Sequence, residues 1–146
     1  MKIMVSACLL GENVKYNGGN NKNEELINFL KDFEVIKVCP ECLGGLPIPR
    51  DPAEVRDNHD YTKNDKDVTE SFMLGAKKTL EIAKANDIKV AILKKNSPSC
   101  GFGTTYDGTF THTIIEGNGI TADLLNKNGI IVFNEENYNN IKNKFW

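Results

Sequence analysis

Hydrophobic positions along this chain follow two patterns, which are short apolar runs and longer stretches with apolar side chains at every third or fourth position. Runs of the first kind have the length of strands, and the spacing of the second kind is helical. The expected strands are Lys2–Ser6, Glu34–Val38, Ile88–Leu93 and Ile130–Phe133. The expected helices are Asn23–Phe33, Val68–Asn86, Thr121–Asn126 and Glu135–Trp146. Because strands alternate with helices, the sequence predicts an α/β fold, a Rossmann-like three-layer sandwich with a mostly parallel sheet of about four to five strands.

Two stretches show no clear period. Residues 39–67 hold four of the five prolines and two consecutive glycines, so an irregular excursion is expected there. Residues 94–107 form a polar, Gly-rich loop, and residues 108–115 are either a strand extension or a β-like edge. The chain has no internal repeat, low-complexity tract or linker, which predicts one domain over residues 1–146.

Composition and charge narrow the class of protein. Hydrophobic residues make up 40% of the 146 positions and charged residues 26%, which are values of a globular domain. A formal net charge of -2 excludes the broad positive field of a non-specific nucleic-acid binder, although it is compatible with a local basic groove. No apolar run approaches the roughly 20 residues that cross a bilayer, and the first residues lack a signal-peptide pattern. We therefore expect a cytoplasmic protein.

Four cysteines in a reducing compartment are expected to be thiols or metal ligands. Cys8, Cys39 and Cys100 each follow an expected strand closely, in loops rich in Gly or Pro. Since the carboxyl ends of parallel strands meet at one edge of the sheet, these three thiols should converge there. A single such cysteine is most simply a small buried residue. Three at corresponding positions favour a shared metal ion or iron-sulfur cluster, whose positive charge holds thiolates together.

Zinc and iron-sulfur remain the two candidates at this point. Cys39 and Cys42 form a CxxC pair, as in many zinc sites, but a second pair is missing. His59 and His112 have no ligand-like partner nearby in sequence and are expected to be surface or loop residues. A thioredoxin-type redox motif is disfavoured, because such a CxxC opens a helix whereas Cys42 leads into Leu-Gly-Gly-Leu-Pro. No nicotinamide or flavin is expected.

Several ordered motifs together resemble one family. They are Ser6–Gly18 (SACLLGENVKYNG), Val38–Glu41 (VCPE), Gly44–Arg50 (GGLPIPR), Pro52–Glu54 (PAE), Lys95–Gly101 (KNSPSCG), Tyr106–Phe110 (YDGTF) and Gly119–Ala122 (GITA). In these motifs, which run nearly end to end, the chain is similar to the thiouracil desulfidase (desulfurase) family, long catalogued as a domain of unknown function.

The resemblance implies an iron-sulfur-dependent enzyme. It implies a 4Fe-4S cluster held by Cys8, Cys39 and Cys100, with the fourth iron free of protein thiolate. This open iron would polarise the thiocarbonyl of a thiolated pyrimidine such as 2-thiouracil, and water would complete a non-redox desulfuration that gives uracil and hydrosulfide. Cys42 departs from the family pattern and is expected to be a bystander.

Polar residues near the cysteines are candidates for catalysis. Glu41 is a candidate general base, with the alternative that it orients the Gly-Gly loop or pairs with Arg50. Ser97 and Ser99 flank Pro98 and are candidates for binding substrate oxygen or cluster sulfide, and a role in the turn alone is the alternative.

Further candidates line the same expected edge of the sheet. Lys95, together with Lys94, is expected to steady developing negative charge, unless both are simply solvated. Tyr106 and Asp107, followed by Gly108, are candidates for a substrate-binding wall, and a Tyr-Asp-Gly turn is the alternative.

Arg50 is a candidate substrate-binding residue, and we also consider an ion pair between Arg50 and Glu54 that clamps the excursion over the site. The glycines at 44, 45 and 101 fit either close approach of the backbone to a cluster or tight turns.

Two other functions stay open on the sequence alone. One is desulfuration of thiolated nucleosides in tRNA, which the acidic balance weighs against without excluding it. The other is a zinc or iron-sulfur binding module without turnover. Under the desulfidase hypothesis, the expected partner is a small thiolated pyrimidine, and no membrane is involved.

Overall fold

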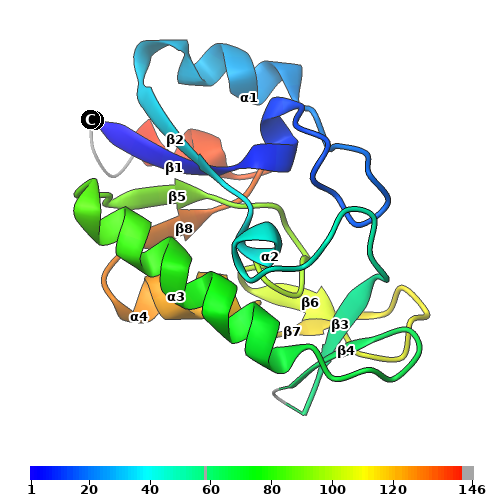
Figure 1. The fold of residues 1–146 in the computed structure, drawn as a ribbon. Coiled ribbons are helices and arrows are strands. Elements are labelled where there is room, and N and C mark those ends of the chain that lie inside the picture. The colour runs from blue at the N-terminus through cyan, green and yellow to red at the C-terminus, as the bar shows by residue number, and fades with distance from the viewer. Residues whose placement is uncertain (58, 143–146) are drawn as a thin grey trace.

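A four-stranded parallel sheet forms the centre of the protein (Figure 1). The computed structural model describes residues 1–57 and 59–142. The sheet has the order β2-β1-β5-β8, and each neighbouring pair is parallel. Its strands are β1 (Lys2–Ser6), β2 (Glu34–Val38), β5 (Val90–Ile92) and β8 (Ile131–Phe133). The four strands expected from the apolar runs are all present, and the predicted α/β class is confirmed.

Helical segments cover both faces of this sheet, which gives three layers (Figure 1). One face packs against α3 (Thr69–Ala85) and α4 (Ile120–Lys127). The other face packs against α1 (Glu24–Phe29) and the 3-10 turn Tyr138–Asn140. None of the helices in the described ranges is long and apolar enough to cross a membrane.

Side chains of β1 alternate between the two cores. Ile3 and Val5 belong to the core on the α1 side, and Met4 belongs to the core on the α3 side. All three side chains are fully buried. A strand covered on both faces buries successive side chains, which explains why Ile3–Val5 form an unbroken apolar run rather than an alternation.

The ends of two expected helices differ from the sequence prediction. At α1, the Asn23 side chain accepts a hydrogen bond from the Leu26 amide at 3.0 Å and caps the helix as expected, but the helix ends at Phe29 and a 3-10 turn follows. The expected terminal helix Glu135–Trp146 contains the 3-10 turn noted above, and its last four residues lie outside the described residues.

The prediction of an irregular excursion over residues 39–67 was wrong. This stretch contains α2 (Pro40–Leu43) and an antiparallel hairpin of β3 (Ala53–Arg56) and β4 (His59–Thr62). The buried positions of the hairpin are the polar residues Glu54, Asp60 and Thr62. Because the inward side chains are polar, no hydrophobic alternation marks these strands in the sequence.

A second hairpin replaces the long loop expected after β5. It consists of β6 (Thr104–Tyr106) and β7 (Ile114–Glu116), which pair antiparallel from Thr104 opposite Glu116 to Tyr106 opposite Ile114. Every residue of β7 is exposed, so this strand carries no burial signal. Figure 1 shows the two hairpins side by side beyond the carboxyl ends of the central strands, where they extend the walls of the site.

Two glycines let α2 touch α3 directly. A Cβ atom at Gly75 would overlap the carbonyl group of Pro40, and one at Gly44 would overlap the carbonyl group of Ser71. Only glycine permits this approach of backbone to backbone. The contact fixes α2 on the long helix, and it thereby fixes Cys39, which is the N-cap residue of α2.

Candidate active site

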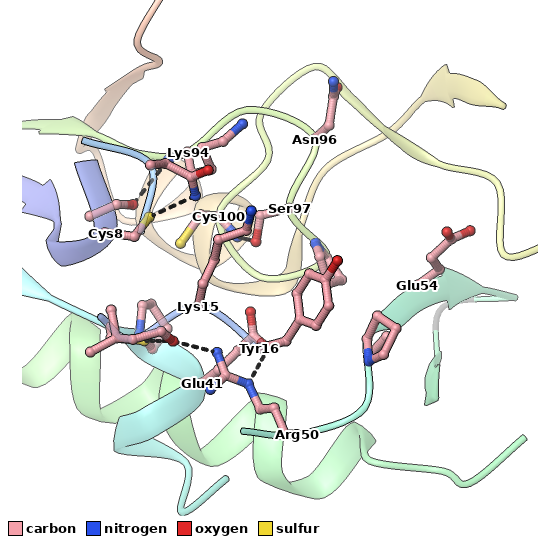
Figure 2. Close-up of a pocket in the computed structure, with 18 of the residues that line it drawn as sticks. Cys8, Lys15, Tyr16, Glu41, Arg50, Glu54, Lys94, Asn96, Ser97 and Cys100 are labelled. Carbon is pink, nitrogen blue, oxygen red and sulfur yellow. Dashed lines mark hydrogen bonds and ion pairs between the residues drawn. The ribbon is translucent and has the colours of Figure 1, made fainter. Parts of the chain in front are cut away.

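Three cysteines from three strand ends meet at one cavity. Cys8 lies in the 3-10 turn that follows β1, Cys39 comes directly after β2, and Cys100 lies in the loop that follows β5. All three line a cavity of about 480 Å³. Figure 2 shows Cys8 and Cys100 on one side of this cavity, with Glu54 on the opposite side. The convergence that the strand ends predicted is therefore confirmed.

The surroundings of the three thiols disfavour bare thiolates. Burial raises the pKa of Cys8, Cys39 and Cys100, and that of Cys39 reaches about 12. Charge on Cys8 or Cys39 raises the pKa of Cys100 further. Asn21 Nδ2 donates a hydrogen bond to Cys8 Sγ at 3.4 Å, which lowers the pKa of Cys8 but offsets the effect of burial only in part. Three ionised thiols in this cavity would need a cationic partner such as a metal centre.

The set of donor atoms suits an iron-sulfur cluster. Within residues 1–57 and 59–142, no three His, Cys, Asp or Glu side chains are close enough to hold a single metal ion. The three thiols instead line one cavity of about 480 Å³, which has room for a larger group. Sulfur is a soft ligand and the usual one for iron-sulfur clusters.

Glu41 lies on the first turn of α2 and forms an ion pair with Arg50 beside the thiols (Figure 2). Arg50 Nε donates to Glu41 Oε1 at 3.1 Å, and the guanidinium also donates to the carbonyl oxygens of Val14 at 2.9 Å and Pro47 at 3.2 Å. Burial raises the pKa of Glu41, and the Arg50 charge opposes this rise. The pairing considered as an alternative for Glu41 is present, and both side chains line the cavity.

Arg50 and Glu54 do not form the expected ion pair, so that hypothesis was wrong. Arg50 pairs with Glu41. The Glu54 carboxylate instead accepts hydrogen bonds from the backbone amides of Gly108 at 3.0 Å and Phe110 at 3.2 Å. Glu54 thus ties the first hairpin to the second.

The two serines of the Ser-Pro-Ser segment have different surroundings. Ser97 lines the cavity, and its Oγ accepts hydrogen bonds from the amides of Ser99 at 3.2 Å and Cys100 at 3.0 Å. Ser99 is buried, and its hydroxyl lies 2.7 Å from that of Thr121. The side chain of Ser99 faces α4 rather than the cavity, because the loop turns at Pro98. Ser97 therefore shapes the Cys100 turn and borders the cavity at once.

The two lysines after β5 are both paired with glutamates. Lys94 Nζ lies 2.9 Å from Glu135 Oε2, and Lys95 Nζ lies 2.7 Å from Glu136 Oε2. The bond to Glu136 raises the pKa of Lys95. Both lysines line the cavity, and the Lys94 charge is the one that lowers the pKa of Cys8.

Tyr106 and Asp107 separate in the structure although they are neighbours in sequence. Tyr106 lines the cavity and meets His112 edge to face, with ring centroids 5.9 Å apart. Asp107 does not line it. The Asp107 carboxylate accepts hydrogen bonds from the amide and hydroxyl of Thr109 at 2.9 and 2.6 Å, and these bonds lower its pKa. The turn considered as the alternative is therefore the observed arrangement at Asp107.

One expectation about a motif near the site was wrong. The Cys39–Cys42 motif does open a helix, contrary to the argument used against a redox CxxC, because α2 begins at Pro40. His112 lies exposed in a loop, as expected, and the same loop places it on the cavity wall. Cys42 is not among the residues that line the cavity, which agrees with a bystander position.

Close backbone packing accounts for Gly44 and Gly101. Gly44 contacts α3 as described above, and a Cβ atom at Gly101 would lie 2.7 Å from the Ser97 carbonyl oxygen. Gly45 has a φ of 89° and serves a turn. Gly44 and Gly101 thus approach the protein's own backbone, whereas a Cβ atom at Gly45 would meet nothing within 4 Å.

Sequence reasoning missed several residues of the cavity wall. Lys15 and Tyr16 reach it from the loop after Cys8, and Phe110 and His112 reach it from the second hairpin (Figure 2 labels the first two). Lys15, Tyr16 and Phe110 stand inside the quoted motifs, so their positions carried a signal. The sequence pattern does not reveal that these loops fold back over the edge of the sheet.

The sequence profile of 2-thiouracil desulfurase matches residues 3–137, which include every residue of the cavity wall. The chain belongs to the 2-thiouracil desulfurase family. It is 40% identical to the uncharacterized protein YbbK of Bacillus subtilis (strain 168), over 95% of this chain and 99% of that protein. Among solved structures it is similar to the 4Fe-4S-dependent thiouracil desulfidase TudS (DUF523Vcz), with a TM-score of 0.91 and 40% identity over 98% of this chain and 96% of the other.

Membership of the 2-thiouracil desulfurase family agrees with the resemblance seen in the sequence. The similarity to the solved desulfidase extends over the central sheet and over nearly the whole chain. The family membership therefore rests on the whole fold rather than on a local motif.

Proposed function

We propose that this chain hydrolyses the carbon–sulfur double bond of a thiolated pyrimidine such as 2-thiouracil. Water supplies the oxygen of the new carbonyl group, and uracil and hydrosulfide leave, so no net oxidation or reduction takes place. The observation that carries the proposal is the convergence of Cys8, Cys39 and Cys100 on one cavity wall. The family and the name of the solved relative support the same activity.

The three thiols would hold a 4Fe-4S cluster, which matches the cofactor named for the solved relative. When bound, such a cluster supplies a Lewis-acidic iron with affinity for the soft sulfur of the substrate. Cys8, Cys39 and Cys100 bind it as thiolates. The ammonium group of Lys94 favours the ionised form of Cys8, and the hydrogen bond from Asn21 does the same.

Proton transfer in this proposal belongs to Glu41. Its carboxylate lines the cavity two residues after Cys39, and Arg50 holds it in one orientation through the bond to Nε. A buried carboxylate beside the thiols can accept a proton from the attacking water. Ser97, which borders the same cavity, still has its hydroxyl proton available for the substrate because its oxygen only accepts bonds in the turn.

Lys95, Ser99, Tyr106, Asp107 and Arg50 were the other candidates. Tyr106 remains a substrate-binding candidate on the cavity wall. Lys95 borders the cavity, but its ammonium group donates a hydrogen bond to Glu136. The guanidinium of Arg50 donates its hydrogen bonds to oxygens of the protein. We therefore assign Arg50 a role in orienting Glu41, and Ser99 and Asp107 roles in their turns.

Anaerobic reconstitution followed by a hydrosulfide-release assay tests the proposal. We expect about four iron and four sulfide per chain, as for one cubane cluster, and release of hydrosulfide from 2-thiouracil. Parallel assays with 4-thiouracil and thiolated tRNA compare the substrate classes. A protein that binds zinc only, or one that binds the cluster but releases no hydrosulfide from any of these, would refute an enzyme of this kind and support a binding module.

Free thiolated pyrimidine is the substrate class that we favour over thiolated tRNA. The solved relative is named for thiouracil, and the net charge of -2 offers no general attraction to a polyanion. We also propose a reducing compartment such as the cytoplasm as the working location, because all four cysteines are free thiols.

A further inference from the structure

The tip of the second hairpin, residues 107–113, is an ordered loop beside the cavity. Gly108, Phe110 and His112 all have positive φ angles, of 91°, 60° and 61°. Such angles suit glycine, but they are unfavourable for side chains as large as phenylalanine and histidine. Backbone of this kind persists only when surrounding contacts impose it.

Two sets of contacts impose this conformation. On the outer side, the hydroxyl groups of Thr109, Thr111 and Thr113 follow one another at 2.6 and 2.8 Å, and the first also binds Asp107. These threonines are exposed. The threonines do not line the cavity, whereas the side chains between them do: Phe110, which is half-buried, and His112, which is exposed on its other side. The alternation therefore separates a polar outer edge from an aromatic inner edge.

On the inner side, Glu54 anchors the loop. One carboxylate oxygen accepts both the Gly108 amide and the Phe110 amide. Glu54 itself is only 8% exposed and sits on β3, so it connects the loop to the rigid first hairpin. A Cβ atom at Gly108 would lie 2.8 Å from Arg56 Cβ, which shows how closely the loop is seated there.

The aromatic inner edge forms one wall of the cavity that the three thiols also line. Tyr106 extends this wall, because its ring meets that of His112 at 5.9 Å, within the range of favourable aromatic pairs. A flat heterocycle with its sulfur directed at the thiols presents its ring to the rest of the cavity wall. Aromatic side chains are the usual surface for such a ring.

We infer that Phe110 and His112 form the wall against which the substrate ring lies, and that Glu54 is the positioning residue that holds this wall in place. The inference rests on the proposed function, since the ring is that of a thiolated pyrimidine. It makes Phe110 and His112 determinants of substrate affinity and specificity. Glu54 also borders the cavity, and its role in this inference is to hold the loop through the Gly108 and Phe110 amides.

The test uses the full chain, reconstituted anaerobically, with three variants of the wall and its anchor. Phe110→Gly removes the ring and suits the backbone angle, and His112→Asn does the same because asparagine tolerates positive φ. Glu54→Leu removes the acceptor at similar bulk. Glu54→Gln keeps the acceptor oxygen, and Ile114→Ala changes an exposed side chain of the same hairpin as a control.

The measurements are kcat and KM with 2-thiouracil, the dissociation constant of uracil by equilibrium dialysis, and iron per chain. For Phe110→Gly we expect KM and the dissociation constant to rise about tenfold, with kcat nearly unchanged, because a contact made equally in substrate and transition state changes KM alone. Glu54→Leu should show the same rise, while Glu54→Gln and Ile114→Ala should not. Iron content should stay at the wild-type value in all variants.

Affinities that stay within about twofold of wild type in both Phe110→Gly and His112→Asn would overturn the inference while hydrosulfide release still supports the proposed function. If wild-type protein binds uracil without releasing hydrosulfide from 2-thiouracil, the proposed function fails, and the dialysis values of the variants still decide the inference. A wild-type protein that binds no pyrimidine overturns the inference as well. Should Glu54→Leu not fold, the two loop variants carry the test alone.

Discussion

Arg50 Nε donates a hydrogen bond to Glu41 Oε1 at 3.1 Å, and this pair forms part of the wall between two cavities. On one side is the cavity with the three thiols, and on the other is a cavity of about 430 Å³ that Glu41 and Arg50 also line. The Arg50 side chain is only 7% exposed. Its bonds to Val14, Glu41 and Pro47 join the loop after β1, α2 and the loop before β3.

Replacing Arg50 by glutamine should lower the free energy of unfolding by about 3 kcal/mol, because a largely buried carboxylate loses its charged partner. Urea denaturation of the protein without cofactor measures this change. Lys127→Gln breaks an exposed ion pair with Asp123 and serves as the control, with an expected loss of about 0.5 kcal/mol or less. Equal effects of the two substitutions would show that the Arg50 bonds contribute little.

Glu41→Gln should lower kcat by about 10²- to 10⁴-fold, because glutamine cannot accept the proton from water. The amide oxygen still offers Arg50 an acceptor, so folding and iron content should remain close to wild type. Single-turnover assays on protein of matched iron content give the comparison. Activity that survives in Glu41→Gln would assign the proton transfer to a different group.

The two cysteines of α2 should respond differently to replacement. Cys39→Ser should abolish retention of the cluster, since Cys39 lines the cavity with Cys8 and Cys100. Cys42→Ser should keep both the cluster and the activity, because Cys42 is not part of that wall. Iron and sulfide analysis after anaerobic gel filtration distinguishes the two. Loss of the cluster from Cys42→Ser would point to four thiolate ligands.

Gly75→Ala tests the contact between α2 and α3. Helix propensity alone predicts that alanine stabilises an exposed helix by about 1 kcal/mol relative to glycine. The overlap of the new Cβ with the Pro40 carbonyl group predicts the opposite sign, a loss of about 1–3 kcal/mol or more. Thermal unfolding should show a lower Tm than wild type, and iron retention should fall because α2 carries Cys39. An alanine at the exposed Lys77 position of the same helix should leave both unchanged.

Asp60 should make stability fall as the pH rises. Burial raises its pKa from 3.8 to about 7, and the nearby charges of Glu41 and Asp67 add to the effect. Asp60 is 2% exposed, and within the described part of the chain its Oδ1 has no hydrogen-bond partner. The folded protein therefore holds a proton that the unfolded chain releases above pH 3.8, and stability is lost progressively between about pH 4 and 7.

At about 1.4 kcal/mol for each pH unit, the upper limit of this loss is about 4 kcal/mol. Asp60→Asn removes the titrating group, so we expect its unfolding free energy to exceed that of wild type at pH 8 and to approach it at pH 4. Denaturation curves across this pH range provide the measurement. Parallel curves for the two proteins would show that Asp60 does not control the pH dependence.

The central sheet could be predicted from the sequence because its strands are buried on both faces. Runs such as Ile3–Val5 contain no polar residue, so the strands are easy to recognise. The helices that alternate with these strands then predict a parallel sheet. The same logic places three cysteines at one edge of the sheet. The first hairpin escaped prediction because its inward residues include Glu54 and Asp60, which resemble loop residues in a pattern of hydrophobicity, and the second because every residue of β7 is exposed.

The partners of individual side chains were less predictable than their positions. Arg50 stands four residues from Glu54 and nine from Glu41, yet it pairs with the more distant residue because α2 turns Glu41 toward it. Ser97 and Ser99 are nearly adjacent, but the turn at Pro98 sends one to the cavity and the other to Thr121. Such choices depend on loop conformation, which neither spacing nor composition determines.

Because Cys8, Cys39 and Cys100 come from three separate loops at the end of a parallel sheet, the three thiols share one cavity only once that sheet has formed. This sets an order of events during biosynthesis. If the three thiols hold a cluster as proposed, the polypeptide must reach its native tertiary structure before the cluster can bind. The protein thus differs from zinc-finger domains, in which the metal itself drives the folding of the chain.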